Sequence, residues 1–151
     1  MQSKTHLDSI LKNSSLACLL LIANFVLGNC KVPTQLEGVN LIYTVDPMWS
    51  SSNPNAGATF QLQFDKTHYF NKQINGKKYF SGEYTYEVLD KENGIGLYTG
   101  YEFSPQKKPA HTILFKCLDN HYGKAIFTQL EGENETEPRQ NSATYSIISS
   151  L

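Results

Sequence analysis

Three histidines and two aspartates are the residues of this sequence whose chemistry could go beyond packing. They are His68, His111, His121, Asp65 and Asp119. Imidazole titrates near neutral pH and binds zinc or copper, so these residues would suit a metal site or an acid and base pair. Their spacing matches no known ligand motif, and surface or strand-end histidines without a function are the simpler interpretation. We therefore predict no metal site, no cofactor and no catalytic residue.

The chain lacks the short motifs of the common enzyme classes. It contains no Gly-x-Ser-x-Gly, no His-Glu-x-x-His, no paired Cys-x-x-Cys and no glycine loop for phosphate. This argues against the common hydrolase and nucleotide-binding classes. With 13 basic and 14 acidic residues the formal net charge is −1. Such a balance favours neither nucleic acid nor an anionic membrane surface as a partner.

Tyrosines are concentrated on the central part of the chain. Tyr84, Tyr86 and Tyr98 are the ones that we assign to ligand or partner binding, because tyrosines that line the mouth of a barrel form a cup for an apolar ligand. The competing interpretation is that these side chains pack across neighbouring strands and keep their hydroxyl groups in water.

One long segment without periodicity, residues 46–57, holds the only tryptophan. Trp49 stands beside Met48 in this segment, and long loops in compact domains are usually functional or disordered. An exposed methionine and tryptophan would anchor a partner. Alternatively, the loop folds Trp49 over an open barrel end and plugs it.

Elements that would position these residues follow from alternation of apolar and polar side chains. Apolar residues recur every second position, and no stretch of ten or more residues has helical spacing. The best example is 58–65, in which Phe60, Leu62 and Phe64 share one face. The predicted strands are 36–45, 58–65, 68–74, 78–89, 95–103, 111–117, 122–130 and 142–149.

Short turns separate most of these strands. Asn75-Gly76, Asn93-Gly94 and Asp119-Asn120 have the chemistry of tight hairpins. We therefore predict an all-β fold in which about eight strands form an antiparallel up-and-down meander. Closure into a small barrel hides the strand edges completely, and a two-sheet sandwich is the alternative.

The N-terminus has the signature of a signal peptide. Lys4 and Lys12 precede an uncharged apolar run, LACLLLIANFVL at 16–27, and Gly28 follows it. The run is shorter than the roughly 20 residues that a spanning helix needs. We predict a signal peptide over 1–29 and one β domain over 30–151. This places the domain in a bacterial periplasm or cell envelope, or outside the cell.

Two cysteines remain in the mature chain, Cys30 and Cys117. The residues before Cys30, with Leu27 three positions upstream, resemble a bacterial lipobox, and this resemblance implies a lipid anchor. The alternative is a disulfide to Cys117, which would add about 4 to 5 kcal/mol to the free energy of unfolding. We favour the anchor, since a disulfide requires two Cα atoms about 5.5 to 6 Å apart.

The strand patterns resemble a known group of small barrels. The segments 58–65 (ATFQLQFD), 81–86 (SGEYTY), 96–98 (GLY) and 112–115 (TILF) are similar to the calycin-type barrels of the MoaF-like and lipocalin-like group. The resemblance implies a barrel whose interior or mouth holds an apolar ligand or a partner. It assigns no catalytic residue.

Together these features predict an exported, non-enzymatic binding barrel. Its partner would be an apolar small molecule or a protein, the latter in an inhibitor or immunity-type role, and membrane contact would come only through a lipid at Cys30. The alternative is a motif-poor barrel enzyme or a metal-binding protein that uses His68 or His121.

Overall fold

The computed structural model describes residues 30–102, 109–130 and 139–150. The predicted signal peptide over 1–29 lies outside the described residues and stays a prediction. In the described ranges, no helix has the length and apolar character needed to cross a membrane.

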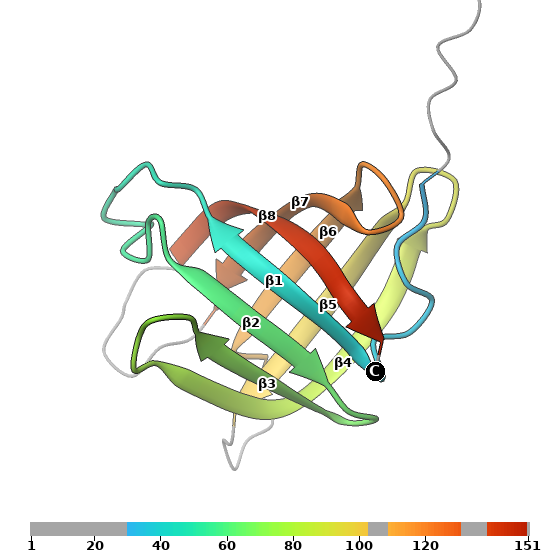
Figure 1. Ribbon diagram of the computed structural model, residues 1–151, viewed down its shortest axis with the longest axis horizontal. Coiled ribbons are helices and arrows are strands. Elements are labelled where there is room, and N and C mark those ends of the chain that lie inside the picture. The colour runs from blue at the N-terminus through green and yellow to red at the C-terminus, as the bar shows by residue number, and fades with distance from the viewer. Residues whose placement is uncertain (1–29, 103–108, 131–138, 151) are drawn as a thin grey trace, which may run out of the picture.

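Eight antiparallel strands form a closed barrel (Figure 1). Each strand pairs with the next in sequence, and the last pairs with the first. This confirms the predicted meander and its closure, and it excludes the two-sheet sandwich. The strands are β1 (Val39–Val45), β2 (Thr59–Phe64), β3 (His68–Gln73), β4 (Tyr79–Asp90), β5 (Ile95–Glu102), β6 (His111–Cys117), β7 (Tyr122–Gln129) and β8 (Arg139–Ser150).

Alternation along the strands sends one set of side chains into the barrel, as in β6. His111, Ile113 and Phe115 are buried, while Thr112 and Leu114 between them are partly exposed. Because successive side chains of a strand point to opposite faces, the apolar positions of all eight strands meet in one core.

Two strand starts differ from the sequence prediction by three residues, and the other boundaries agree to within one residue. β1 begins at Val39, because Leu36 lies in a turn in which the Val39 N–H donates to the Leu36 carbonyl and Gly38 has a φ of +76°. β8 begins at Arg139, three residues before the predicted start, where Arg139 pairs with Gln129 of β7.

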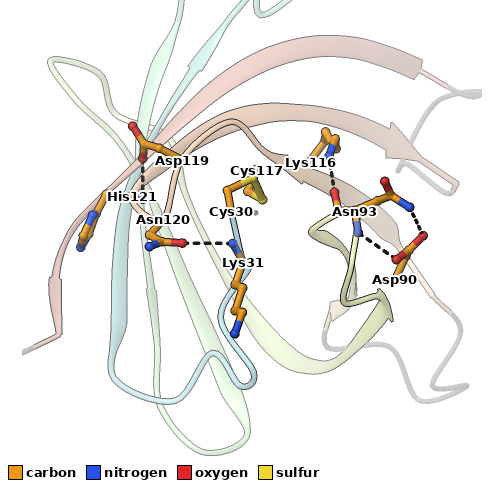
Figure 2. The surroundings of a disulfide bond; sticks show 9 residues. All are labelled: Cys30, Lys31, Asp90, Asn93, Lys116, Cys117, Asp119, Asn120 and His121. Atoms are coloured by element: carbon orange, nitrogen blue, oxygen red, sulfur yellow. Dashed lines mark hydrogen bonds between the residues drawn. A yellow bond between two sulfur atoms is a disulfide. The ribbon is translucent and has the colours of Figure 1, made fainter. Parts of the chain in front are cut away.

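One end of the barrel, which we call the closed end, is covered by residues 30–38. It contains the β2–β3, β4–β5 and β6–β7 turns, and the blue segment in Figure 1 crosses it. Val32 and Leu36 are buried in the core there. The Tyr86 hydroxyl donates to the Pro33 carbonyl at 2.9 Å, and the Lys31 N–H donates to Asn120 Oδ1 at 3.1 Å (Figure 2). The covering segment is thus held by apolar packing and by hydrogen bonds.

A disulfide bond joins this segment to β6. Cys30 and Cys117 are bonded, their Cα atoms are 5.9 Å apart, and 87 positions separate them in sequence (Figure 2). A sulfur in a disulfide cannot also carry a lipid thioether, so our preference for a lipid anchor at Cys30 was wrong. The geometric coincidence that a disulfide requires arises because the covering segment passes directly over the end of β6.

Candidate ligand-binding cavity

The opposite end of the barrel, the open end, leads into a cavity of about 200 Å³. This end carries the β1–β2 loop and the β3–β4 turn. The residues that line the cavity come from these connections and from seven strands, all except β5. They are Tyr43, Val45, Asn55, Phe60, Leu62, Asn71, Lys78, Phe80, His111, Ile113, Phe127, Gln129, Arg139 and Asn141.

Much of the cavity wall is aromatic or aliphatic. Phe60 and Leu62 of β2 face it, and Ile113 and Phe127 come from the paired strands β6 and β7. Ligand sites in proteins are usually apolar hollows with a small number of placed polar groups. This wall therefore suits the apolar body of a small molecule.

Two polar contacts bring β1, β5, β6 and β8 together beside this wall. The Tyr43 hydroxyl donates to Asn141 Oδ1 at 3.1 Å, and burial raises the pKa of Tyr43. His111 Nε2 and the Tyr98 hydroxyl lie 3.1 Å apart and share a hydrogen bond. Because these side chains satisfy one another, their polar groups are stable in the barrel interior.

His111 is enclosed by aromatic rings and stays uncharged at neutral pH. Its ring stacks on Phe127 at a centroid distance of 5.4 Å and meets the edge of Tyr69 at 5.3 Å. Burial lowers the pKa of His111 to about 4, since the charged form would lose its hydration. The opposing residue Gly100 leaves room for the imidazole, because a Cβ there would lie 2.5 Å from the ring.

Asn71 differs from the other buried polar residues around the cavity. Its Oδ1 atom is buried and has no hydrogen-bond partner among the described residues. The residues paired with Asn71 are Leu62 on β2 and Phe80 on β4, and both have apolar side chains. An amide oxygen without a partner in the described part of the chain is therefore hidden beside apolar side chains.

Charge at the mouth of the cavity is positive among the described lining residues. Lys78 and Arg139 are the two ionised groups there. Lys78 Nζ donates to Asn55 Oδ1 at 2.7 Å, which ties the β3–β4 turn to the β1–β2 loop. This hydrogen bond fixes one side of the opening.

The three tyrosines assigned to binding lie in the barrel but do not line the cavity. Tyr98 is fully buried beneath it, with its ring 5.5 Å from that of His111. Tyr84 and Tyr86 bond to carbonyl groups at the closed end, those of Asp65 and Pro33. The stacking of Tyr84 on Tyr98 across neighbouring strands follows one part of the competing interpretation. The other part was wrong for Tyr98, whose buried hydroxyl bonds to His111 and does not lie in water. The role of the three tyrosines in binding stays a prediction.

Met48 and Trp49 are presented to solvent by the β1–β2 loop. They are 79% and 75% exposed. The Asn53 side-chain amide donates to the carbonyl groups of Asp46 and Met48 and so holds the loop in shape. Trp49 therefore does not plug the barrel. Partner binding by the exposed pair stays a prediction.

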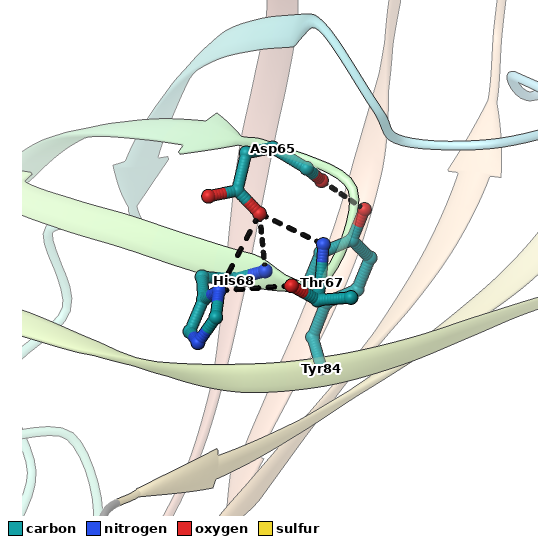
Figure 3. A network of polar contacts seen from close by, with 4 residues as sticks. All are labelled: Asp65, Thr67, His68 and Tyr84. Atoms are coloured by element: carbon teal, nitrogen blue, oxygen red, sulfur yellow. Dashed lines mark hydrogen bonds and ion pairs between the residues drawn. The ribbon is translucent and has the colours of Figure 1, made fainter.

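The histidines and aspartates of the closed end lie in or beside turns. At the β2–β3 turn, Asp65 Oδ1 accepts the N–H groups of Thr67 and His68, and it lies 3.6 Å from His68 Nδ1 (Figure 3). Asp119 Oδ1 accepts the His121 N–H at the β6–β7 turn. Both aspartates thus form turns. Among the described residues, no group of three or more His, Cys, Asp or Glu is placed to hold a metal.

Sequence analysis missed the principal residues of the cavity. Asn71, Asn141 and Tyr43 were not singled out, and His111 was interpreted as a surface or strand-end histidine without a function. Two signals were present: His111 and Asn71 each occupy an inward position of an alternating strand. A polar residue in such a position is unusual enough to indicate a site.

Comparison of the chain with known protein families, curated proteins and solved structures finds no match. The resemblance to calycin-type barrels therefore stays a prediction, since a barrel shape alone does not identify a family.

Proposed function

We propose that this protein is a non-enzymatic binding barrel that takes a small, largely apolar molecule into its open-end cavity. The observation that carries the proposal is the contrast between a filled end and an end that contains a cavity of about 200 Å³. An apolar cavity of about 150 Å³ holds benzene. A molecule with one or two rings is therefore the right size.

Naphthalene is a suitable first probe, and methyl NMR gives the readout. Leu62 lines the cavity, whereas Val32 is buried at the closed end. Titration should shift the Leu62 methyl resonances in a saturable way and leave those of Val32 in place. Saturable shifts at Val32, or none at Leu62, would contradict the proposal.

A pair of tryptophan substitutions controls for non-specific binding. Ile113→Trp fills the cavity from its wall, whereas Ile126→Trp adds the same side chain on the barrel exterior, where Ile126 is exposed. The first variant should lose naphthalene binding and the second should keep it. Circular dichroism of both variants checks that the barrel is intact.

We also propose that the protein acts in an oxidising compartment outside the cytosol. Disulfides persist in such compartments and are rare in the cytosol, and this chain carries one between Cys30 and Cys117. Intact-mass analysis of protein from its native host should show a chain that lacks the leader and two thiol protons. A full-length, reduced chain would contradict the proposal.

A further inference from the structure

The rim of the open-end cavity combines positive charge with an exposed aromatic ring. Lys78 directly precedes β4 and lies two positions before Phe80, which is 41% exposed, and both residues line the cavity. Arg139 lines it from the start of β8. In the ring of strands, β1 and β2 separate β8 from the β3–β4 hairpin on one side, and β5 to β7 do so on the other. The two cations therefore flank the opening.

Below this rim, the described part of the cavity wall carries no charge. His111 is neutral because burial lowers its pKa to about 4, and its Nε2 atom shares a hydrogen bond with the Tyr98 hydroxyl. The Tyr43 hydroxyl donates to Asn141 Oδ1. An ionised group of a ligand would lose its hydration at this depth without gaining an opposite charge, which is costly. A charged ligand group therefore belongs at the rim, where water and the two cations are both in reach.

Lys78 can bind an anion at the rim without giving up its present contact. Its Nζ atom donates to Asn55 Oδ1 at 2.7 Å, and this amide oxygen carries no charge. An ammonium group has three donors, so further hydrogen bonds can form. The Lys78 side chain is exposed, so these donors are open to a ligand in the mouth. The contact with Asn55 holds the ammonium group beside the opening.

We propose that the open-end cavity selects small molecules with an apolar body and one carboxylate group, and that Lys78 pairs with this carboxylate at the rim. This inference rests on the proposed function of the cavity. The apolar body lies between Phe60 and Phe127, and Phe80 contacts the part of it that is nearest the mouth. Arg139 adds a second positive charge, which disfavours cationic ligands.

Two probes of nearly equal shape test the role of Lys78. 2-Naphthoate carries a carboxylate where 2-naphthamide carries a neutral amide. Their dissociation constants are measured by the Leu62 methyl shifts in wild type and in Lys78→Met. An exposed ion pair corresponds to about 1.5- to 5-fold in affinity. The affinity of 2-naphthoate relative to 2-naphthamide should fall by about that factor in Lys78→Met, while 2-naphthamide binds as tightly as before.

Lys72→Met is the matched control. It makes the same change of charge in the same hairpin, but Lys72 is exposed on the outer face of β3 and does not line the cavity. This variant should keep the wild-type ratio of the two affinities. In wild type the ratio should also fall towards that of Lys78→Met at about 1 M salt, where charges are screened beyond about 3 Å.

A cationic probe, 2-(aminomethyl)naphthalene, tests the sign of the charge. Wild type should bind 2-naphthoate more tightly than this cation, and Lys78→Glu should shift the ratio towards the cation by more than Lys78→Met does. Tighter binding of the cation by wild type would overturn the inference.

Failure of this inference can be told apart from failure of the cavity proposal. If 2-naphthamide shifts Leu62 but the ratio of 2-naphthoate to 2-naphthamide affinity is the same in wild type and Lys78→Met, the carboxylate selection is refuted and the cavity proposal stands. If none of the three probes shifts Leu62 in wild type, both proposals are contradicted.

Discussion

The two ends of the barrel are built from the same alternating strands, but their interiors are filled to different degrees. At the closed end, Val32 and Leu36 fill the interior and the Cys30–Cys117 disulfide fixes the covering segment. At the open end, the interior is left partly empty. The comparison indicates that packing at one end stabilises a barrel whose other end is free to carry a less stable, functional surface.

The largest difference between the ends should appear when the disulfide is removed. Cys30→Ala opens a loop of 87 residues and should lower the free energy of unfolding by about 4 to 5 kcal/mol, measured by urea denaturation. A reductant should destabilise wild type to a similar degree and leave Cys30→Ala unchanged. Equal stability of the variant and oxidised wild type would mean that the disulfide contributes nothing to the free energy of unfolding.

A pair of leucine truncations compares packing at the two ends directly. Leu36 is 2% exposed at the closed end, whereas Leu130 is 47% exposed at the open end. Leu36→Ala should cost about 2 to 5 kcal/mol, and Leu130→Ala should cost about 0.5 kcal/mol or less. Similar losses in the two variants, measured by urea denaturation, would show that the ends do not differ in packing.

His111 should make the open end sensitive to acid. Burial holds the pKa of His111 at about 4, below its usual value of 6.5 in the unfolded chain. Between these values the unfolded state binds a proton that the folded state does not. Stability should therefore fall as the pH decreases from about 6.5 to about 4, by on the order of 3 kcal/mol, and this loss should end below that window.

His111→Gln controls the measurement because glutamine does not titrate. Two turn aspartates also have lowered pKa values, Asp65 through the N–H group of Thr67 and Asp90 through the side chain of Asn93. Their stabilisation is lost only at lower pH and is present in both proteins. Urea denaturation of wild type and His111→Gln over the window should give different slopes. Parallel curves would show that His111 titrates normally.

The smallest effect is expected in the β1–β2 loop. Trp49→Ala should change the free energy of unfolding by about 0.5 kcal/mol or less, because this side chain is exposed. Asn53→Ala should cost about 1 to 3 kcal/mol, since the Asn53 amide holds the loop. Thermal denaturation compares the two. A large loss in Trp49→Ala would mean that the indole packs against the barrel.

Much of this fold could be predicted from the sequence. Alternation in residues 58–65 placed Phe60, Leu62 and Phe64 on the buried face, as the structure confirms. The turn at Asn75-Gly76 was also recognised, and Asn75 adopts the positive φ of 59° that such turns use. Local chemistry is sufficient for strands and turns because both depend on neighbours in sequence.

The cavity could not be predicted from the sequence in the same way. Asn71, His111 and Asn141 lie on β3, β6 and β8, and only the closed barrel brings their side chains to one space. The disulfide has the same origin, since the path of residues 30–38 over β6 decides whether Cys30 reaches Cys117. Contacts between distant strands depend on register and closure, which no local pattern specifies.

A crystal soaked in 6-bromo-2-naphthol would test the assignment of binding to the open end most directly, because bromine is located by its anomalous scattering. The account predicts a bromine peak inside the cavity beside Leu62 and Phe127. Bromine found only on the outer face of the barrel or at the closed end would contradict it.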